Sequence, residues 1–267
     1  MKDFYDGKVV WVIGATSGIG EELVKQLSKL NCKLILSARR SRELERVQKE
    51  NGLTVSNSYL LPLDLEYFDS LASSVRAAEK KFGSIDVVFN NGGISQRSFA
   101  KDTVMATYKK IMAINFFGNV AITQAVLPQM RNRNSGSIVV ISSIAGLIGT
   151  PLRTGYSASK FALQGFYESL QAELEGTNIR VTIVNPGFIQ TNISVNALTG
   201  TGEQTGKMDE AIEKGLPVEY CARQILKATA NRKYQLTVSG FKERFAVLIK
   251  KFSPSLLRKI VSKAITK

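Results

Sequence analysis

Short apolar runs alternate with amphipathic stretches along most of this 267-residue chain. Each run is mostly apolar, as expected for a strand that is buried on both faces of a parallel sheet. The runs lie at 8–13, 32–37, 58–61, 85–89, 138–141, 179–184 and 234–238. Helical periodicity is clearest at 67–82, 103–130, 156–174 and 218–230. The alternation predicts an α/β fold, with a doubly wound, seven-stranded parallel sheet and helices on both faces.

The same pattern sets the domain organisation. Residues 1–240 hold the alternation of strands and helices and are long enough for one large domain with a full core. Within them, residues 188–217 are rich in Gly, Thr and Asn and show little periodicity. A loose segment that follows the C-terminal end of a strand is more often an active-site lid than a linker, so we expect a lid there.

The last part of the chain, residues 241–267, consists of two basic amphipathic segments separated by Ser253 and Pro254. It holds eight Lys or Arg residues against one Glu. The apolar positions at helical spacing are Phe241, Phe245, Leu248 and Phe252, and then Leu256, Leu257, Ile260, Val261, Ala264 and Ile265. Basic amphipathic helices can lie on an anionic bilayer. They can equally dock onto the domain or onto a second subunit, and the sequence leaves these alternatives open.

The net charge of +14 and the pI near 9.8 permit nucleic acid, an anionic membrane or a phosphorylated ligand as partner. No base-stacking motif or recognition helix accompanies the lysines, and half of the excess charge lies in the tail. We therefore expect no specific binding of nucleic acid.

Residue types that are scarce or missing narrow the chemistry further. The chain contains no histidine, which excludes Ser-His-Asp and Cys-His catalysis and His-ligated zinc, so we predict no metal site. Its two cysteines, Cys32 and Cys221, are far apart, which fits a reducing compartment. The N-terminus lacks the layout of a signal peptide, and no run approaches 18 apolar residues, which argues against a spanning helix. We expect a cytoplasmic protein that can contact a membrane surface peripherally.

A glycine-rich turn follows the first apolar run and leads into a helical pattern. Glycines at such a turn let a diphosphate approach the backbone, and the helix N-terminus supplies N–H donors and a positive dipole end. This position, at the start of a strand-helix-strand unit, favours dinucleotide binding over a purely structural turn. The predicted cofactor contacts are Gly14, Thr16, Ser17, Gly18, Ile19 and Gly20.

Arg39 and Arg40 follow the second run, where an NAD-binding unit would present a carboxylate to the adenosine ribose. Ala38 stands at the position of that carboxylate. Guanidinium groups suit a 2′-phosphate, so the sequence predicts NADP(H) as the cofactor. The alternative is that the two arginines only open the charged helix that follows.

Polar residues and glycines also end the third and fourth runs. Asp64, followed by Leu65, can accept a hydrogen bond from an adenine amino group, or it can cap the next helix. Asn91, Gly92 and Gly93 suggest another close approach of the backbone to a ligand. We count all five among the candidate cofactor contacts.

Four further polar side chains are candidates for catalysis. Ser143 follows the fifth run at its C-terminal end, where ligands bind in open α/β sheets. Tyr156 and Lys160 are four apart on a predicted helix, so they share a face, and the ammonium favours ionisation of the phenol. Tyr156 is therefore a candidate acid/base near neutral pH. Asn115 lies among apolar residues inside a helix, so its amide is either a structural tie or part of a polar site.

Taken together, these motifs resemble the short-chain dehydrogenase/reductase superfamily over about residues 7–238. The resemblance is carried by the glycine turn, Asp64, Asn90, Asn91, Gly92, Asn115, Ser143, Tyr156, Lys160, Pro186, Gly187 and Thr191. Within the superfamily, the chain is similar to the dehydrogenase/reductase member 7-like branch in its segments SARR, ELERV, LPLDL, and NNGG followed by SQRS. It departs from the usual pattern at Ile13 and Gly93, where the family has Thr and Ala.

The resemblance implies a Rossmann-type NAD(P)-binding catalytic domain that assembles as a homodimer or homotetramer. In such a domain Tyr156 would protonate the carbonyl oxygen, and Lys160 would lower the pKa of Tyr156 and bind the nicotinamide ribose. Ser143 would orient the carbonyl, and Asn115 would hold a water that links Lys160 to solvent. The implied contacts to the cofactor are Tyr156, Lys160, Pro186, Gly187, Ile189 and Thr191, with Arg39 on the 2′-phosphate.

The sequence thus predicts an NADP(H)-dependent oxidoreductase, such as a carbonyl reductase, that acts on the C=O or CH-OH group of a small molecule. Apolar residues of the predicted lid, among them Phe188, Ile189 and Ile193, favour a lipophilic substrate. The alternative is a non-catalytic dinucleotide-binding sensor or regulatory protein. Such proteins tend to lose the acid/base residue, which this chain retains.

Overall fold

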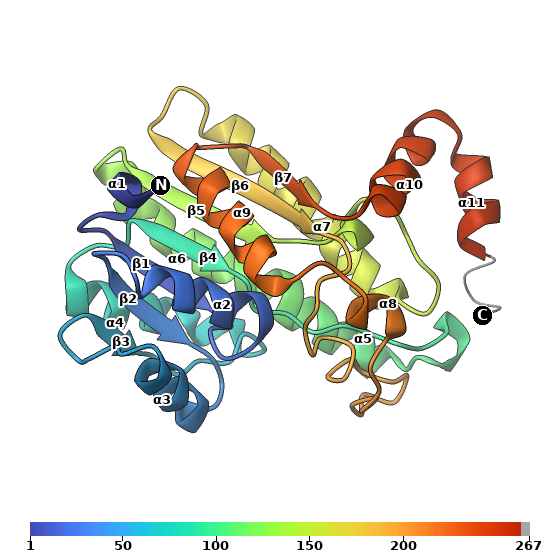
Figure 1. Ribbon diagram of the computed structural model, residues 1–267, viewed down its shortest axis with the longest axis horizontal. Helices are drawn as coiled ribbons and strands as arrows, with labels where there is room; N and C mark the ends of the chain where they lie inside the picture. The colour runs from blue at the N-terminus through green and yellow to red at the C-terminus, as the bar shows by residue number, and fades with distance from the viewer. Residues whose placement is uncertain (263–267) are drawn as a thin grey trace.

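Seven parallel strands run through the centre of the molecule (Figure 1), which the computed structural model describes for residues 1–262. Their order in the sheet is β3-β2-β1-β4-β5-β6-β7. The strands are β1 (Val9–Ile13), β2 (Lys33–Ser37), β3 (Ser58–Leu60), β4 (Val87–Asn90), β5 (Gly136–Ile141), β6 (Ile179–Pro186) and β7 (Gln235–Val238). The order reverses between β1 and β4, which opens a crevice at the carboxyl ends of the strands. The predicted doubly wound parallel sheet is confirmed.

Helices cover both faces of the sheet because alternate strand residues point to opposite faces. Val10 and Val12 of β1 belong to one apolar core and Trp11 and Ile13 to the other. The first core includes residues of α2 (Gly18–Leu27), α3 (Ser41–Glu50) and α9 (Val218–Ala230), and the second includes residues of α4 (Leu71–Phe82), α6 (Gly118–Asn132) and α7 (Thr154–Glu173). Both cores are continuous along the sheet, so its carboxyl edge is a rigid platform.

The short elements lie mostly in the connections between strands and helices. They are α1 (Lys2–Tyr5), α8 (Glu210–Glu213) and the 3-10 helices η1 (Phe68–Ser70), η2 (Ala100–Asp102) and η4 (Ile144–Gly146). Helix α8 belongs to the predicted lid, which is otherwise irregular from residue 188 to residue 217.

The long helix predicted at 103–130 is one continuous helical stretch with a wide turn inside it. It comprises α5 (Met105–Met112), a π-helical turn η3 (Ala113–Phe117) and α6. A π turn places one residue more in a turn than an α-helix does and is frequent at functional sites. The predicted buried Asn115 lies inside this turn.

The same helical stretch is long and apolar enough to cross a membrane by length and composition, with a mean hydropathy of 1.4 over its best window. This differs from the sequence-based expectation that no such segment exists. The reason is its place in the fold: 44% of that window is buried within the protein, and Ile122, Val126 and Met130 pack into the core under the sheet. It therefore has the character of a core helix of the domain.

The tail forms two helices, α10 (Phe241–Phe252) and α11 (Pro254–Ser262), which project at one end of the molecule (Figure 1). The predicted break at Ser253 and Pro254 is confirmed. The predicted apolar positions Ala264 and Ile265 lie outside the described residues. Leu257 packs with Ile144 and Ile148 of the domain, so the tail docks onto the domain as one of the two alternatives expected.

Candidate active site

The glycine turn between β1 and α2 is shaped for a ligand that approaches its backbone. Gly14 and Gly18 have positive φ angles of 76° and 53°, which L side chains rarely adopt. A side chain at Gly14 would also lie 2.9 Å from the Cα of Gly92, at the end of the neighbouring strand. The N-terminus of α2 directly follows the turn, so its N–H groups point toward this space. These residues fit the diphosphate of a dinucleotide.

Asn91 and Thr191 hold the glycine turn in place from two sides. The Asn91 Nδ2 atom donates a hydrogen bond to the Gly14 carbonyl at 3.1 Å. A Cβ atom at Gly18 would lie 3.0 Å from the Thr191 Cγ2 atom, so glycine at this position allows the lid to close against the turn. The structure thus gives Asn91 a positioning role besides the cofactor contact that the sequence predicts.

Arg39 and Arg40 are exposed at the carboxyl end of β2, and neither forms an ion pair with any residue from 1 to 262. The nearby arginine that does form ion pairs is Arg46 of α3, which lies 2.8 Å from Glu21 and 3.0 Å from Glu43. Arg39 and Arg40 are therefore available to an anion. Arg40 precedes the first residue of α3, so the alternative role at the start of that helix is also compatible with the structure.

Asp64 and Leu65 lie in the connection after β3. The Asp64 Oδ1 atom accepts a hydrogen bond from the Glu66 backbone N–H at 3.0 Å, which orders the turn before η1. The Leu65 side chain is buried against Gly92, where an added Cβ would lie 2.5 Å from its Cδ1 atom. Both residues shape the wall of the crevice next to the glycine turn.

Asn115 is completely buried, and its side chain joins the wide turn to two other segments. Its Oδ1 atom accepts from the Ile94 N–H at 2.8 Å, and its Nδ2 atom donates to the Ile94 carbonyl at 2.9 Å and to the Ser159 Oγ atom at 2.9 Å. The structural tie expected as one alternative is therefore present. A Cβ atom at Gly93 would lie 3.2 Å from Asn115 Oδ1 and 3.5 Å from Lys160 Nζ, so Asn115 and Lys160 both lie against Gly93.

Tyr156 and Lys160 lie on one face of α7, as predicted, and both are buried. The Lys160 Nζ atom lies 5.7 Å from the centre of the Tyr156 ring and donates a hydrogen bond to the Ile141 carbonyl at 2.8 Å. Burial lowers the pKa of Lys160 to about 8. The carbonyl at the end of β5 therefore fixes the ammonium below the phenol.

Burial raises the pKa of the Tyr156 phenol, and two neighbours oppose this effect. The larger opposing contribution to the pKa comes from hydrogen bonding to Ser143, and the smaller one from the positive charge of Arg153. The sequence assigned the electrostatic role to Lys160, whereas the structure adds Arg153 as a second cation near the phenol. Arg153 precedes Tyr156 by three residues, at the N-terminal end of α7.

Ser143 lies at the end of β5, where its side chain caps the 3-10 helix η4. Its Oγ atom accepts from the Ala145 N–H at 3.1 Å and donates to the Pro186 carbonyl at 3.4 Å. The hydroxyl is thereby held beside the Tyr156 phenol, between the ends of β5 and β6. These two strands deliver the polar atoms of the site together.

Gln96 is a positioning residue that the sequence did not reveal. Its side chain is completely buried, and its Oε1 atom accepts from the Gly155 N–H at 2.6 Å and from the Tyr156 N–H at 3.3 Å. Its Nε2 atom donates to the Thr103 Oγ1 atom at 3.0 Å. Gln96 thus satisfies free N–H groups in the first turn of α7 and fixes the helix end that carries Tyr156.

A large pocket of about 600 Å³ opens in front of these residues, a volume typical of small-molecule sites. The predicted residues that line it are Ser17, Gly18, Ile19, Asn91, Gly93, Ser143, Tyr156, Lys160, Pro186, Gly187, Ile189 and Thr191. The predicted residues outside its lining are Gly14, Thr16, Gly20, Arg39, Arg40, Asp64, Leu65, Gly92 and Asn115. The structure therefore brings the candidate acid/base residues, the glycine turn and the lid together around one space.

The lid is fastened over this pocket by a charged cluster. The Asp209 Oδ2 atom of the lid lies 2.8 Å from the Arg97 Nη1 atom and 3.0 Å from the Arg153 Nη2 atom. Asp209 and Arg153 are largely buried, and all three residues line the pocket. Because Arg153 also acts on Tyr156, the cluster links the position of the lid to the electrostatics of the phenol.

The tail helices supply another wall of the pocket, which the sequence did not predict. Residues of both α10 and α11 line it, among them Ala246, Ile260 and Val261. The Glu243 Oε1 atom accepts a hydrogen bond from the Phe188 N–H at 3.2 Å, at the start of the lid. The predicted boundary at residue 240 separates the domain from the tail, and residues on both sides of it line the same pocket.

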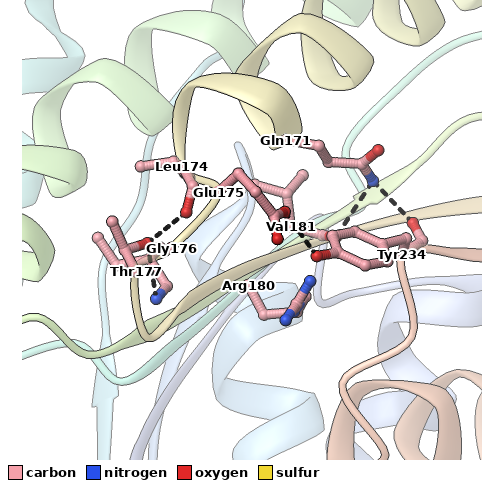
Figure 2. Close-up of a pocket in the computed structure, with 9 residues that line it drawn as sticks. Gln171, Leu174, Glu175, Gly176, Thr177, Arg180, Val181 and Tyr234 are labelled. Carbon is pink, nitrogen blue, oxygen red and sulfur yellow. Dashed lines mark hydrogen bonds between the residues drawn. The ribbon is translucent and has the colours of Figure 1, made fainter.

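A second cavity lies away from this site, between α7 and the amino ends of β6 and β7 (Figure 2). Its volume is about 20 Å³, which is room for about one water molecule. Its polar groups are satisfied within its own lining: the Gln171 side chain donates to the Tyr234 backbone carbonyl at 2.8 Å, and the Tyr234 hydroxyl donates to the Glu175 side chain at 2.9 Å (Figure 2). No group of three or more His, Cys, Asp or Glu side chains within residues 1–262 could hold a metal ion.

Comparisons with known proteins agree with the geometry. A model of the short chain dehydrogenase family matches residues 8–201. The dehydrogenase/reductase SDR family protein 7-like of Drosophila melanogaster is 41% identical over 265 residues, which cover 98% of this chain and 81% of that protein.

Solved structures share the fold. A short chain dehydrogenase/reductase from Burkholderia phymatum in complex with NAD has a TM-score of 0.83 at 22% identity, covering 94% of this chain and 95% of that chain. The closed form of a serine dehydrogenase complexed with NADP⁺ has a TM-score of 0.78 at 26% identity, covering 88% and 95%. The chain therefore belongs to the short-chain dehydrogenase/reductase family, as an oxidoreductase that uses a nicotinamide dinucleotide, and it is similar to the family's protein 7-like members.

Proposed function

We propose that the protein transfers a hydride between NADP(H) and the carbonyl or alcohol group of a lipophilic small molecule, with Tyr156 as the acid/base. The observation that supports this most directly is the buried Tyr156 phenol, which faces the 600 Å³ pocket together with Ser143 and Lys160. When bound, the nicotinamide supplies or accepts the hydride. The protein's own residues place the reacting groups and move the proton.

The proton step follows from the pKa directions at the site. Because burial raises the pKa of Tyr156, the phenol keeps its proton at neutral pH and can give it to a carbonyl oxygen. The Ser143 hydroxyl, which donates to the Pro186 carbonyl at 3.4 Å in this structure, would turn to donate a second hydrogen bond to that oxygen. The charges of Arg153 and Lys160 would stabilise the phenolate that forms. Asn115 and Lys160 adjoin Gly93, where a water held by Asn115 would return a proton from solvent.

Substitution of Tyr156 by Phe tests this role. We expect the variant to bind NADPH as the unchanged protein does, because the ring still fills its buried place. Turnover of a panel of ketones and alcohols should fall by about a thousandfold, since the proton donor is gone. Turnover that is unaffected would show that another group moves the proton. Absence of turnover in the unchanged protein, together with tight NADPH binding, would favour a dinucleotide-binding sensor.

The choice of NADP(H) is supported by the exposed Arg39 and Arg40 at the end of β2, where no carboxylate is present. The structural neighbours include a complex with NAD and a complex with NADP⁺, so they do not decide between the two cofactors, and the proposal rests on this chain's own arginines. Replacing Arg39 and Arg40 by Ala should raise the KM for NADPH by tenfold or more and leave the KM for NADH nearly unchanged. Equal use of NADH and NADPH by the unchanged protein would contradict it.

A lipophilic substrate is supported by the apolar lining of the pocket. Its side chains include Ile144, Ile148, Ile193, Ile212 and Val261, which come from the domain, the lid and the tail.

We further propose a homodimer or homotetramer in the cytoplasm, at a membrane surface, on the basis of the family pattern and the basic tail. Light scattering of the purified protein measures the oligomeric state, and cell fractionation measures the location.

A further inference from the structure

The two tail helices carry some apolar side chains that pack on the domain and others that are exposed. The inner side packs on the domain, where Leu257 forms a small core with Ile144 and Ile148, joined by Val247 and Ile249. The outer side consists of six exposed side chains, which we call the tail surface. The tail surface consists of Phe241, Phe245, Leu248, Phe252, Leu256 and Ile260.

Exposure of the tail surface is large for apolar residues. Phe241 is 81% exposed and Phe252 is 76% exposed, whereas Leu257, beside the exposed Leu256, is only 7% exposed. The rings of Phe241 and Phe245 stack on each other at 6.0 Å. The packed inner side satisfies the need of the helices for a core, so the outer apolar side chains do not serve the fold. A concentrated exposed apolar surface of this kind marks an interaction site.

Positive charge surrounds the tail surface. Lys242, Arg244, Lys251, Arg258 and Lys259 are exposed on the same two helices. Within residues 241–262 the only carboxylate side chain is Glu243, and it is half-buried against the Phe188 N–H. The surroundings of the apolar side chains are therefore basic, without an acidic group to balance them.

We propose that the tail surface docks on an anionic lipid bilayer. Exposed phenylalanines and leucines flanked by lysines and arginines match the interface of such a bilayer, where rings enter the acyl boundary and cations meet the headgroups. A second copy of this chain would bring the same positive charges against the first, which disfavours a symmetric contact. This inference deepens the proposed location at a membrane surface. It concerns a surface outside the proposed proton-transfer residues, so it does not depend on the proposed hydride transfer.

Three polar contacts hold the tail surface in a fixed orientation relative to the domain, and one of them is the hydrogen bond that the Arg244 Nη2 atom donates to the Thr237 carbonyl at 3.3 Å. The Lys250 Nζ atom points inward, donates to the Leu147 carbonyl at 2.5 Å and lies 4.5 Å from the centre of the Phe161 ring. Glu243 holds the start of α10 to the lid. Because Ile260 belongs both to the tail surface and to the lining of the pocket, docking places the pocket next to the lipid.

Sedimentation with lipid vesicles tests the proposal. The full chain should bind vesicles of phosphatidylcholine with about a third phosphatidylserine, and this binding should weaken strongly as salt is raised. Vesicles of phosphatidylcholine alone should bind it at least about tenfold more weakly. The double substitution Phe241→Ser and Phe252→Ser should reduce binding to the anionic vesicles by about tenfold or more. Replacing Lys251 or Lys259 by Ala should in each case reduce binding to the anionic vesicles by about fivefold.

Val55→Ser and Tyr67→Ser form a matched control, because these side chains are 79% and 70% exposed but lie outside the tail. They should leave vesicle binding unchanged, and fluorescence of the buried Trp11 reports that all variants are folded. The proposal is overturned if the full chain does not bind anionic vesicles, or if the tail variants bind them as well as the control does. Loss of a dimer in the tail variants, with vesicle binding unchanged, would instead identify a second copy as the partner.

Discussion

Helix α7 and the tail helices α10 and α11 face the same pocket, but they are attached to the fold in different ways. Helix α7 lies on the central sheet. Its Lys160 ammonium and the N–H groups of its first turn donate buried hydrogen bonds to the Ile141 carbonyl and to the Gln96 Oε1 atom. The tail is held by a small apolar core around Leu257 and by three polar contacts. The comparison shows that the side of the pocket that carries the proposed proton-transfer residues is built rigidly, whereas the opposite wall is a lightly attached addition.

The largest expected effect comes from loosening the rigid side at Gln96. Gln96→Leu removes the acceptor of the Gly155 and Tyr156 N–H groups, which are buried. We expect a loss of about 1–3 kcal/mol in the free energy of unfolding. We also expect kcat to fall by about a hundredfold because Tyr156 is displaced. Urea unfolding and steady-state kinetics measure the two effects.

Gln96→Glu is the conservative control, because it keeps an oxygen that accepts from Gly155. It should restore most of the kcat that Gln96→Leu loses. If both variants keep the full kcat, the end of α7 does not depend on Gln96, and the contrast between the two walls is weaker than we describe.

The next effect concerns the lid. Asp209→Asn leaves the two guanidinium groups of Arg97 and Arg153 without a countercharge, so the lid should open more often. We expect the KM for the substrate to rise about tenfold and proteolysis within residues 188–217 to become faster. Glu210→Gln is the matched control, because Glu210 is the next residue and pairs with Lys214 in solvent. A similar KM for both variants would show that the charged cluster does not fasten the lid.

A third prediction uses the pH dependence of stability. Because the folded protein lowers the pKa of Lys160 from 10.5 to about 8, the unfolded chain binds more protons between these values. The contribution of Lys160 to the free energy of unfolding should therefore rise with pH from about 8, by roughly 1 kcal/mol for one pH unit. The buried cysteines act in the opposite direction above pH 9, because burial raises the pKa of Cys32 to about 11 and that of Cys221 to about 12.

Comparison with Lys160→Met isolates this contribution, because the cysteines are the same in both proteins. Urea unfolding at pH 8 and pH 9 should show the unchanged protein gaining about 1 kcal/mol relative to the variant. Parallel pH profiles of the two proteins would mean that the ammonium is not desolvated, and the rigid side would then be more open to water than its burial indicates.

The smallest effect is expected on the tail side. Glu243→Ala removes the acceptor of the Phe188 N–H but leaves the Leu257 core intact. We expect the KM for the substrate to rise two- to threefold with kcat unchanged, and the free energy of unfolding to fall by about 1 kcal/mol or less. Glu243→Gln keeps the acceptor and should behave as the unchanged protein does. A large loss of kcat in Glu243→Ala would make the tail part of the rigid side.

The central fold could be predicted because each buried strand shows in the sequence as an apolar run. The apolar runs of β1 and β2 begin within one residue of their predicted starts, since a strand that is buried on both faces needs a continuous apolar segment. The positions of Tyr156, Lys160 and Ser143 at one edge followed from the same topology. The branch of the family was also identified correctly from short segments.

Residues that act through long-range contacts could not be predicted. Gln96 belongs to the SQRS segment that helped to identify the branch of the family, but it is 59 residues from Gly155, and the segment itself does not show that the two residues are in contact. Which apolar residues of the tail are buried could not be predicted for a related reason. Helical spacing shows that apolar residues share a face, but α10 has apolar residues on two sides. Leu256 and Leu257 are adjacent in the sequence, and only the position of Ile144 decides which one is buried.

The π turn around Asn115 also has a consequence for the evolution of the chain. A wide turn carries an extra residue that the flanking helices absorb, so it corresponds to a one-residue insertion in an ordinary helix. A one-residue deletion within residues 113–117 would restore regular geometry and leave Asn119 facing the core. It would also remove Asn115 from its contact with Ile94. The length of this helix and the contacts of Asn115 are therefore coupled, so a related sequence that lacks one residue at this point is expected to lack these contacts as well.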